Sequence, residues 1–354
     1  MGKRTEEVIM KYDLDYLIDF GVKLLETPSP TGDTKAAVDL VKSELEKYCH
    51  VEYTRKGALL AKIEGKNKDD AILLSSHVDT LGAMVKELKP NGRLKMSMLG
   101  GYAWATVEGL EVEVATEDGK RIPGTIMTTA ASSHVHGAKT QNIERNDENL
   151  EIRIDEVARN KKDLEDLGIQ VGDFVYYNTG TKLFDSGYLK SRHLDDKACV
   201  ISLVGIAKYL KENNIVPPRT TYLFISNYEE VGHGSSAGIP EEVSEFIAVD
   251  MAAPGQGQTS DEHKVTICVK DSTGPYDLGL KRKFIKLAKE NDIPYVLDIY
   301  PFYGSDASAA QRAGVNARAG LIGPGVDASH SFERTHEDGI KATTDLAIAY
   351  VLAE

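Results

Sequence analysis

Helical and strand-like segments alternate along most of this chain, and the alternation is broken once. Apolar residues recur at helical spacing in residues 13–27, and the continuous apolar run in residues 71–79 has the character of a buried strand. Residues 90–178 differ, because they consist of short alternating stretches separated by Gly, Pro and Asn. We therefore predict an α/β/α sandwich, formed by residues 1–89 and 179–354, with an inserted β-rich domain at residues 90–178.

The charge balance and the cysteine count exclude several classes of function. The 354 residues carry 42 Lys and Arg against 55 Asp and Glu, a net charge of −13, which disfavours binding to nucleic acid or to an anionic membrane. The three cysteines are a sparse, odd-numbered set without a CxxC pair, which indicates a reducing compartment and no disulfide framework. The first residues lack a signal-peptide pattern, no apolar run reaches the ~18 residues of a membrane span, and Glu6 breaks the myristoylation pattern. We expect a cytoplasmic protein.

Acidic and histidine residues cluster where several of the predicted strands end. Ligands of open α/β sheets bind beyond the carboxyl ends of the strands, so residues at these positions are the first candidates for a functional site. Taken singly, each has an ordinary structural explanation, such as a core histidine, a helix N-cap, a solvated pair of glutamates or a turn acid. The clusters are His77 with Asp79, Asp195 with Asp196, Glu229 with Glu230, Asp250, and, near the C-terminus, His330.

Imidazole and carboxylate groups together indicate a metal centre. This donor set suits zinc, cobalt or manganese, and one carboxylate can bridge two ions ~3.5–4 Å apart. Side chains alternate across a strand, so His77 and Asp79 can point the same way, one as a ligand and the other as its hydrogen-bond partner. Glu229 and Glu230 cannot both face one ion from a regular strand, but at a strand end they can divide the roles of base and ligand. These histidine and carboxylate side chains are enough to bind two divalent ions.

Six short motifs, in order along the chain, resemble the signature blocks of the tetrahedral aminopeptidases, also called metallopeptidase family forty-two. They are SSHVDTLGAMV, SRHLDDK, YEEVGHGSS, IAVDMAAPGQG, YGSDASA and SHS. The insertion also resembles that family's β-barrel, PDZ-like dimerisation domain, with PGTI in its first half and IQVGDFV near its end. The resemblance implies a metallo-aminopeptidase that removes N-terminal residues from short peptides. It also implies a homo-oligomer in which dimers build up to dodecamers.

The resemblance further implies a role for each candidate residue. Two divalent ions, zinc or alternatively cobalt or manganese, would share one bridging carboxylate, and a water between them would be the nucleophile. Glu229 would act as the general base on this water, and Asp79 would orient a metal-binding histidine. The five implied ligands are Asp195 as the bridge, His77 and Asp250 at one ion, and Glu230 and His330 at the other.

Departures from the family pattern leave alternatives open. Thr80 stands where the family commonly has an acidic residue, and the segment DASHSFERTH lacks the usual Arg-Tyr pair and offers His336 as a second candidate for the last ligand. This departure leaves an alternative function open: a dimetal amidohydrolase or deacylase that acts on a small N-acylated amino acid or dipeptide. A glycoside hydrolase needs two carboxyl groups ~5–10 Å apart, and adjacent glutamates serve it poorly. His134 and His136 are predicted to lie on the surface or at an interface.

Overall fold

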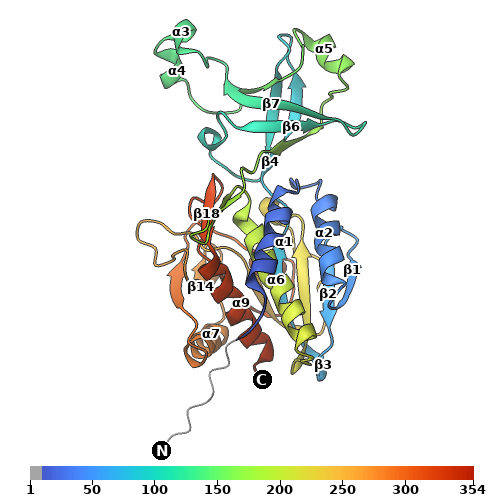
Figure 1. Ribbon diagram of the computed structural model, residues 1–354, viewed down its shortest axis with the longest axis vertical. Helices are drawn as coiled ribbons and strands as arrows, with labels where there is room; N and C mark the ends of the chain where they lie inside the picture. Colours follow the sequence, from blue (N-terminus) through green and yellow to red (C-terminus); the bar gives the residue numbers. More distant parts are fainter. Residues whose placement is uncertain (1–9) are drawn as a thin grey trace, which may run out of the picture.

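The computed structural model describes residues 10–354, which form two domains. Figure 1 shows a larger α/β domain that contains the C-terminus and, at the opposite end of the molecule, a smaller β domain. The predictions about the first residues, that they carry neither a signal peptide nor a myristoylation site, concern residues outside the described range.

A nine-stranded mixed sheet forms the centre of the larger domain. Its middle is parallel: β3 lies between β12 and β13, and β17 follows β13, so the carboxyl ends of these strands meet at one edge. Ile72 and Leu74 of β3 pack on one face, while Ala71 and Leu73 pack on the other. In sheet order the strands are β1 (His50–Tyr53), β2 (Leu59–Ile63), β12 (Arg219–Ser226), β3 (Asn67–His77), β13 (Val243–Val249), β17 (Arg318–Pro324), β14 (Val265–Asp271) and β15 (Gly274–Pro275), with β16 (Tyr295–Ile299) paired to β14.

Helices cover both faces of this sheet, which confirms the predicted α/β/α sandwich. Figure 1 labels the helices of one face, among them α1, α6 and α9. On one face, α6 is buried along most of its length because α1 and α9 pack against it. On the other face, the short helix α8 packs against β13 and β17 and encloses a smaller core. The helices of the first face are α1 (Leu14–Glu26), α2 (Lys35–Leu45), α6 (Leu194–Glu212), α7 (Leu278–Glu290) and α9 (Glu337–Leu352), and α8 spans Asp306–Arg312.

The inserted domain is a closed antiparallel barrel of six strands around its own hydrophobic core. The barrel starts at residue 82 rather than at the predicted boundary of residue 90, because β4 already pairs with β5 and β9. Residues 78–81, which join β3 to β4, contain no Gly or Pro to mark the change of domain. In barrel order the strands are β4 (Gly82–Leu88), β5 (Leu94–Leu99), β8 (Leu150–Ile154), β7 (Arg121–Thr128), β6 (Glu111–Ala115) and β9 (Phe174–Tyr177), and the short helices are α3 (Ser133–His136), α4 (Lys139–Asn142) and α5 (Lys161–Asp166).

A small third sheet pairs the segment that follows the barrel in sequence with the segment that precedes α9. It consists of β10 (Lys182–Leu183), β11 (Tyr188–Ser191) and β18 (Glu333–His336), with β11 in the middle. Cys49, Cys199 and Cys268 are all free thiols, so no disulfide contributes to the fold. Within residues 10–354, no helix combines the length and the apolar character that crossing a bilayer requires.

Candidate metal centre

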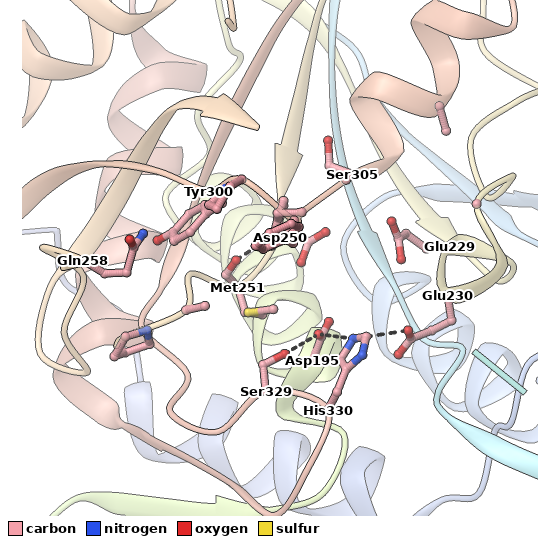
Figure 2. A pocket seen from close by; sticks show the side chains of 18 of the residues that line it. Asp195, Glu229, Glu230, Asp250, Met251, Gln258, Tyr300, Ser305, Ser329 and His330 are labelled. Atoms are coloured by element: carbon pink, nitrogen blue, oxygen red, sulfur yellow. Dashed lines mark hydrogen bonds and ion pairs between the residues drawn. The ribbon is translucent and has the colours of Figure 1, made fainter. Parts of the chain in front are cut away.

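The predicted site residues converge at the carboxyl edge of the parallel strands. His77 is the last residue of β3, Asp250 directly follows β13, and Glu229 begins the short 3-10 helix η2 (Glu229–Val231) after β12. Since β12, β3 and β13 are adjacent parallel strands, their ends bring these side chains together. Figure 2 shows Asp195, from the start of α6, and His330, from the loop after β17, in the same site.

Asp195 lies between two histidines. Its Oδ1 is 3.2 Å from Nε2 of His77, and its Oδ2 is 3.2 Å from Nε2 of His330. Each histidine donates its Nδ1–H to a backbone carbonyl, that of Asp79 for His77 and that of Gly101 for His330, so Nε2 is the nitrogen that faces the centre. A nitrogen lone pair and a carboxylate oxygen face each other at this distance only with a proton or a cation between them. Each oxygen of Asp195 is therefore positioned to share a proton or a cation with one histidine.

The possible ligands divide into two groups of three, one on each side of the centre. Within each group the ligand atoms lie within 4.8 Å of one another, which is close enough for one ion. The first group is Asp195, Glu230 and His330, and the second is His77, Asp196 and Asp250.

Asp196 is the member of these groups that the sequence did not place among the ligands. Its Oδ2 accepts hydrogen bonds from Oγ of Ser76 at 2.5 Å and from the backbone N–H of His77 at 3.3 Å. Its Oδ1 is buried and has no hydrogen-bond partner. The signal that could have found it is the doubled aspartate itself, because a helix N-cap requires only one such side chain.

Asp79 contacts His77 mainly through its backbone. Its carbonyl oxygen accepts the Nδ1–H at 2.9 Å, whereas its carboxylate Oδ1 is 3.6 Å from the same nitrogen. Other donors engage this carboxylate: the hydroxyl of Thr31 at 2.7 Å and the backbone N–H groups of Glu229 at 3.1 Å and Glu230 at 3.3 Å. Asp79 thus orients the imidazole ring and also holds the start of η2, a second contact that the sequence did not indicate.

The inserted domain reaches the centre through the loop that follows β5. The carbonyl of Gly101 accepts the Nδ1–H of His330, so a residue of the insertion orients a candidate ligand. The preceding Gly100 has φ +72°, and a Cβ at this position would lie 2.5 Å from Cδ2 of Leu81 and 3.5 Å from Oε2 of Glu230. Only glycine allows the loop to approach the centre so closely in this conformation.

The centre concentrates buried negative charge. Burial raises the pKa of Glu229 and Glu230 well above the usual range and raises the pKa of Asp250 to about 7. Burial alone would lower the pKa of His330, but the carboxylate of Asp195 outweighs it and raises this pKa to about 10. In the described part of the chain, the ion pairs of Asp195 and of the two glutamates are all with histidines. No lysine or arginine therefore compensates these groups within this part of the chain.

The residues present fit a pair of divalent cations. Two cations would balance the buried carboxylates, and they would take up the lone pairs of the unpartnered buried atoms Oδ1 of Asp196 and Oε1 of Glu230. Imidazole nitrogen and carboxylate oxygen are the donors that zinc, cobalt and manganese accept in proteins. The donor set is thus compatible with two divalent ions.

The structure places the other predicted histidines away from this centre. His336 is the N-cap of α9, where its Nδ1 accepts the backbone N–H of Asp338 at 3.0 Å and its Nε2–H donates to the carbonyl of Ser186 at 2.8 Å. His330, and not His336, therefore faces Asp195. His134 and His136 lie in α3 of the inserted domain and are exposed.

A cavity of about 590 Å³ opens over the centre. Its lining combines the acidic side chains of the centre with apolar ones, among them Met251, Tyr300 and Phe302 (Figure 2 labels Met251 and Tyr300). Phe302 is 98% exposed, so an aromatic ring stands free beside the cavity. This combination offers a reactive acidic region next to a surface that can hold an apolar side chain.

Comparison with known proteins agrees with this site. Residues 57–346 match the family model described as M42 glutamyl aminopeptidase, and the chain belongs to this family of peptidases. It is 46% identical over 331 residues to "Putative aminopeptidase YhfE" of Bacillus subtilis (strain 168), with 93% of this chain and 95% of that protein covered. The resemblance drawn from the six motifs is thereby confirmed, and with it the class of enzyme, a hydrolase that acts as an aminopeptidase.

Solved structures with low sequence identity share the fold. The TET aminopeptidase from the marine sediment archaeon Thaumarchaeota archaeon SCGC AB-539-E09 superposes with a TM-score of 0.86 at 20% identity, over 96% of each chain. The TET1 peptidase of Pyrococcus horikoshii, described as assembling into a tetrahedron or a large octahedral shell, superposes with a TM-score of 0.84 at 21% identity, over 96% of this chain and 100% of that one. These likenesses confirm the α/β fold with its inserted barrel.

Proposed function

We propose that this chain is a dimetal aminopeptidase that hydrolyses N-terminal residues from short peptides, with Glu229 as general base. The observation that carries the proposal is the division of the two oxygens of Asp195, one facing His77 and the other facing His330. A single-ion site needs no such shared carboxylate. Zinc is the expected metal, and cobalt and manganese are the alternatives with the same donor preference.

Two divalent ions held by the two ligand groups would supply Lewis acidity, polarising the scissile carbonyl and making a water molecule more acidic. Glu229 lines the cavity but belongs to neither ligand group, and its Oε2 is 3.7 Å from Nε2 of His77. Its carboxylate accepts a proton from the attacking water and returns it to the leaving amine. Asp79 fixes the position of this base, because its carboxylate accepts the Glu229 backbone N–H.

The cavity favours a peptide with a free N-terminus. Its acidic groups attract the ammonium group, and the neighbouring apolar lining of Met251, Tyr300 and Phe302 suits the side chain of the first residue. The matching family model and the aminopeptidase names of the relatives support this substrate class. The rival is the deacylase, which would use the same centre on an N-blocked small molecule.

The test compares metal-loaded protein on two matched substrate panels. One panel contains dipeptides and tripeptides with free amines, and the other contains N-acetylated amino acids and N-acetylated forms of the same peptides. We expect release of the N-terminal residue from the free-amine panel alone, measured by chromatography of the products. Glu229→Gln protein prepared in the same way is the control for contaminating peptidases. Turnover confined to the N-blocked panel would replace the aminopeptidase with the deacylase.

Assembly and location belong to the same proposal. The barrel acts as the dimerisation domain of a homo-oligomer in which dimers build up to dodecamers, which the TET1 peptidase assemblies support by likeness of fold. Light scattering on the intact protein at micromolar concentration tests it: the expected particle is a multiple of the 38.7 kDa chain, and a stable monomer of that mass would refute it. The three free thiols support a cytoplasmic location.

A further inference from the structure

A second histidine and carboxylate cluster lies outside the catalytic centre. It consists of His263, in the loop before β14, His336, which is the last residue of β18 and the N-cap of α9, and Asp338, in the first turn of α9. One ligand atom from each lies within 4.8 Å of the others. The proposed catalytic mechanism uses none of these residues, and His336 is the histidine that the DASHSFERTH segment offers in addition to His330.

The separations within this cluster are close to those around a small metal ion. Oδ2 of Asp338 is 3.1 Å from Nδ1 of His263 and 3.3 Å from Nδ1 of His336. A tetrahedral zinc ion with bonds of about 2.0–2.2 Å keeps its ligand atoms roughly 3.3–3.6 Å apart. The two imidazole rings are 4.2 Å apart between centroids, and Nδ1 of each ring lies within 3.3 Å of the same oxygen of Asp338.

A second layer of contacts orients the two rings independently of that carboxylate. The Nε2–H of His336 donates to the carbonyl of Ser186 at 2.8 Å, so Nδ1 is the nitrogen that carries the lone pair, and this lone pair accepts the backbone N–H of Asp338 at 3.0 Å. Nε2 of His263 is 3.2 Å from the hydroxyl of Tyr188, whose ring also packs edge-on against both imidazoles. Metal-binding histidines regularly bond to such partners through the other ring nitrogen. These contacts therefore leave Nδ1 of His263 and Nδ1 of His336 facing the carboxylate of Asp338.

We propose that His263, His336 and Asp338 bind a third divalent transition-metal ion, with zinc as the expected ion because zinc accepts both imidazole and carboxylate. A cation can bind both Nδ1 atoms and an oxygen of Asp338 at once, whereas a hydrogen bond to the Asp338 carboxylate involves only one of these Nδ1 atoms. The backbone N–H of Asp338 donates to Nδ1 of His336 at 3.0 Å, so the ion replaces this capping hydrogen bond and binds more weakly than at the catalytic centre. The side chains of His263 and Asp338 are 45% and 58% exposed, which leaves coordination positions open to water.

The cluster and the catalytic centre share β18. Glu333, at the start of this strand, accepts the backbone N–H groups of the candidate ligands Asp195 and His330, and His336 ends the strand. Figure 1 shows β18 above α9, and His336 and Asp338 lie where β18 passes into α9. An ion at the cluster therefore joins the end of β18 to the loop before β14.

Metal analysis of the full-length protein tests the inference. Protein saturated with zinc and passed through a desalting column is analysed for zinc per chain, and the binding isotherm is measured by calorimetry. We expect His263→Ala and Asp338→Asn to lose one zinc per chain relative to the wild type. His50→Ala is the matched control, because His50 forms an exposed pair with Glu52 at 3.2 Å and belongs to none of the candidate metal groups among residues 10–354, and we expect it to keep the wild-type count.

The expected result is independent of the absolute number of ions at the catalytic centre, because only the difference between variants is used. A double variant, His263→Ala with Asp338→Asn, that retains the wild-type zinc count would overturn the proposal, and so would binding seen only in excess zinc and lost on desalting. Cobalt provides a spectroscopic check: the visible absorption of cobalt-loaded wild type minus that of cobalt-loaded His263→Ala should show bands of a histidine-ligated ion. Superposable spectra would count against the site in the same way.

Discussion

Glu333 holds the backbone of Asp195 in place: its Oε2 accepts the Asp195 N–H at 3.0 Å, and its Oε1 accepts the His330 N–H at 2.9 Å. The carboxylate is buried, and burial raises its pKa to about 8. Asp195 and His330 come from the start of α6 and the loop after β17, so one buried side chain sets the separation of two candidate ligands that are distant in sequence.

Glu333→Gln should weaken binding of the ion held by Asp195, Glu230 and His330. An amide has one acceptor oxygen, so one of the two backbone N–H groups loses its partner, and supporting contacts of this kind are typically worth about 10- to 100-fold in metal affinity. Competition with a chelator of known affinity measures the change. Glu212→Gln, at the exposed end of α6, is the control that should leave the affinity as in the wild type.

Asp195→Asn should abolish tight binding of at least one ion. A neutral amide offers one oxygen and no charge, so it cannot bridge two cations as a carboxylate does. Elemental analysis of desalted protein measures the loss. If this variant holds as many ions as the wild type with equal affinity, Asp195 is not the bridge.

Glu229→Gln should keep the metal and lose turnover. Because Glu229 lies outside both ligand groups, its replacement leaves the binding sites intact, and the loss of a positioned base costs roughly 10²- to 10⁴-fold in kcat. Kinetics and metal content are measured on the same preparation. The neighbouring Glu230→Gln is the matched comparison and should lose metal. Metal loss from Glu229→Gln would show that Glu229 is a ligand.

Removal of the metal should lower thermal stability as well as activity. The buried carboxylates of the centre repel one another unless cations or protons lie among them, and an ion that binds only the folded state adds about 2.7 kcal/mol when present at 100 times its Kd. Thermal unfolding with and without a strong chelator measures this, and added zinc should restore both Tm and turnover. Full activity after exhaustive chelation would exclude the dimetal mechanism.

The convergence of His77, Asp250 and the glutamate pair was predictable from the sequence. Each follows a strongly apolar segment, and parallel strands expose their carboxyl ends at one edge, so strand identification alone brings these residues together. Asp195 and His330, which do not follow adjacent strands of the sheet, were also candidates from the sequence pattern, and the family motifs supplied their implied roles as ligands.

Other features of the centre depend on contacts between remote segments and could not be predicted in this way. Glu333 carries no local signal, because its role arises only when β18 lies beside the start of α6. The approach of Gly101 to His330 depends on how the barrel is set against the sheet. The barrel boundary was misplaced by eight residues because β4 follows β3 without a turn-rich linker.

Arg192 joins the inserted barrel to the metal centre, and its replacement should separate metal binding from assembly. Its Nη2–H donates to the carbonyl of Thr106 in the insertion at 2.5 Å, and its Nη1–H donates to the carbonyl of Ser331, next to His330, at 3.1 Å.

In Arg192→Gln the shorter side chain cannot reach both carbonyls, so the loop that carries His330 is less well held. We expect a several-fold loss of metal affinity with an unchanged particle mass by light scattering, because the barrel itself stays intact. Lys162→Gln, which removes an exposed charge on α5 of the insertion, is the control for charge removal. Wild-type metal affinity in Arg192→Gln would mean that the barrel contact does not support the centre, whereas loss of the oligomer would place Arg192 in assembly instead.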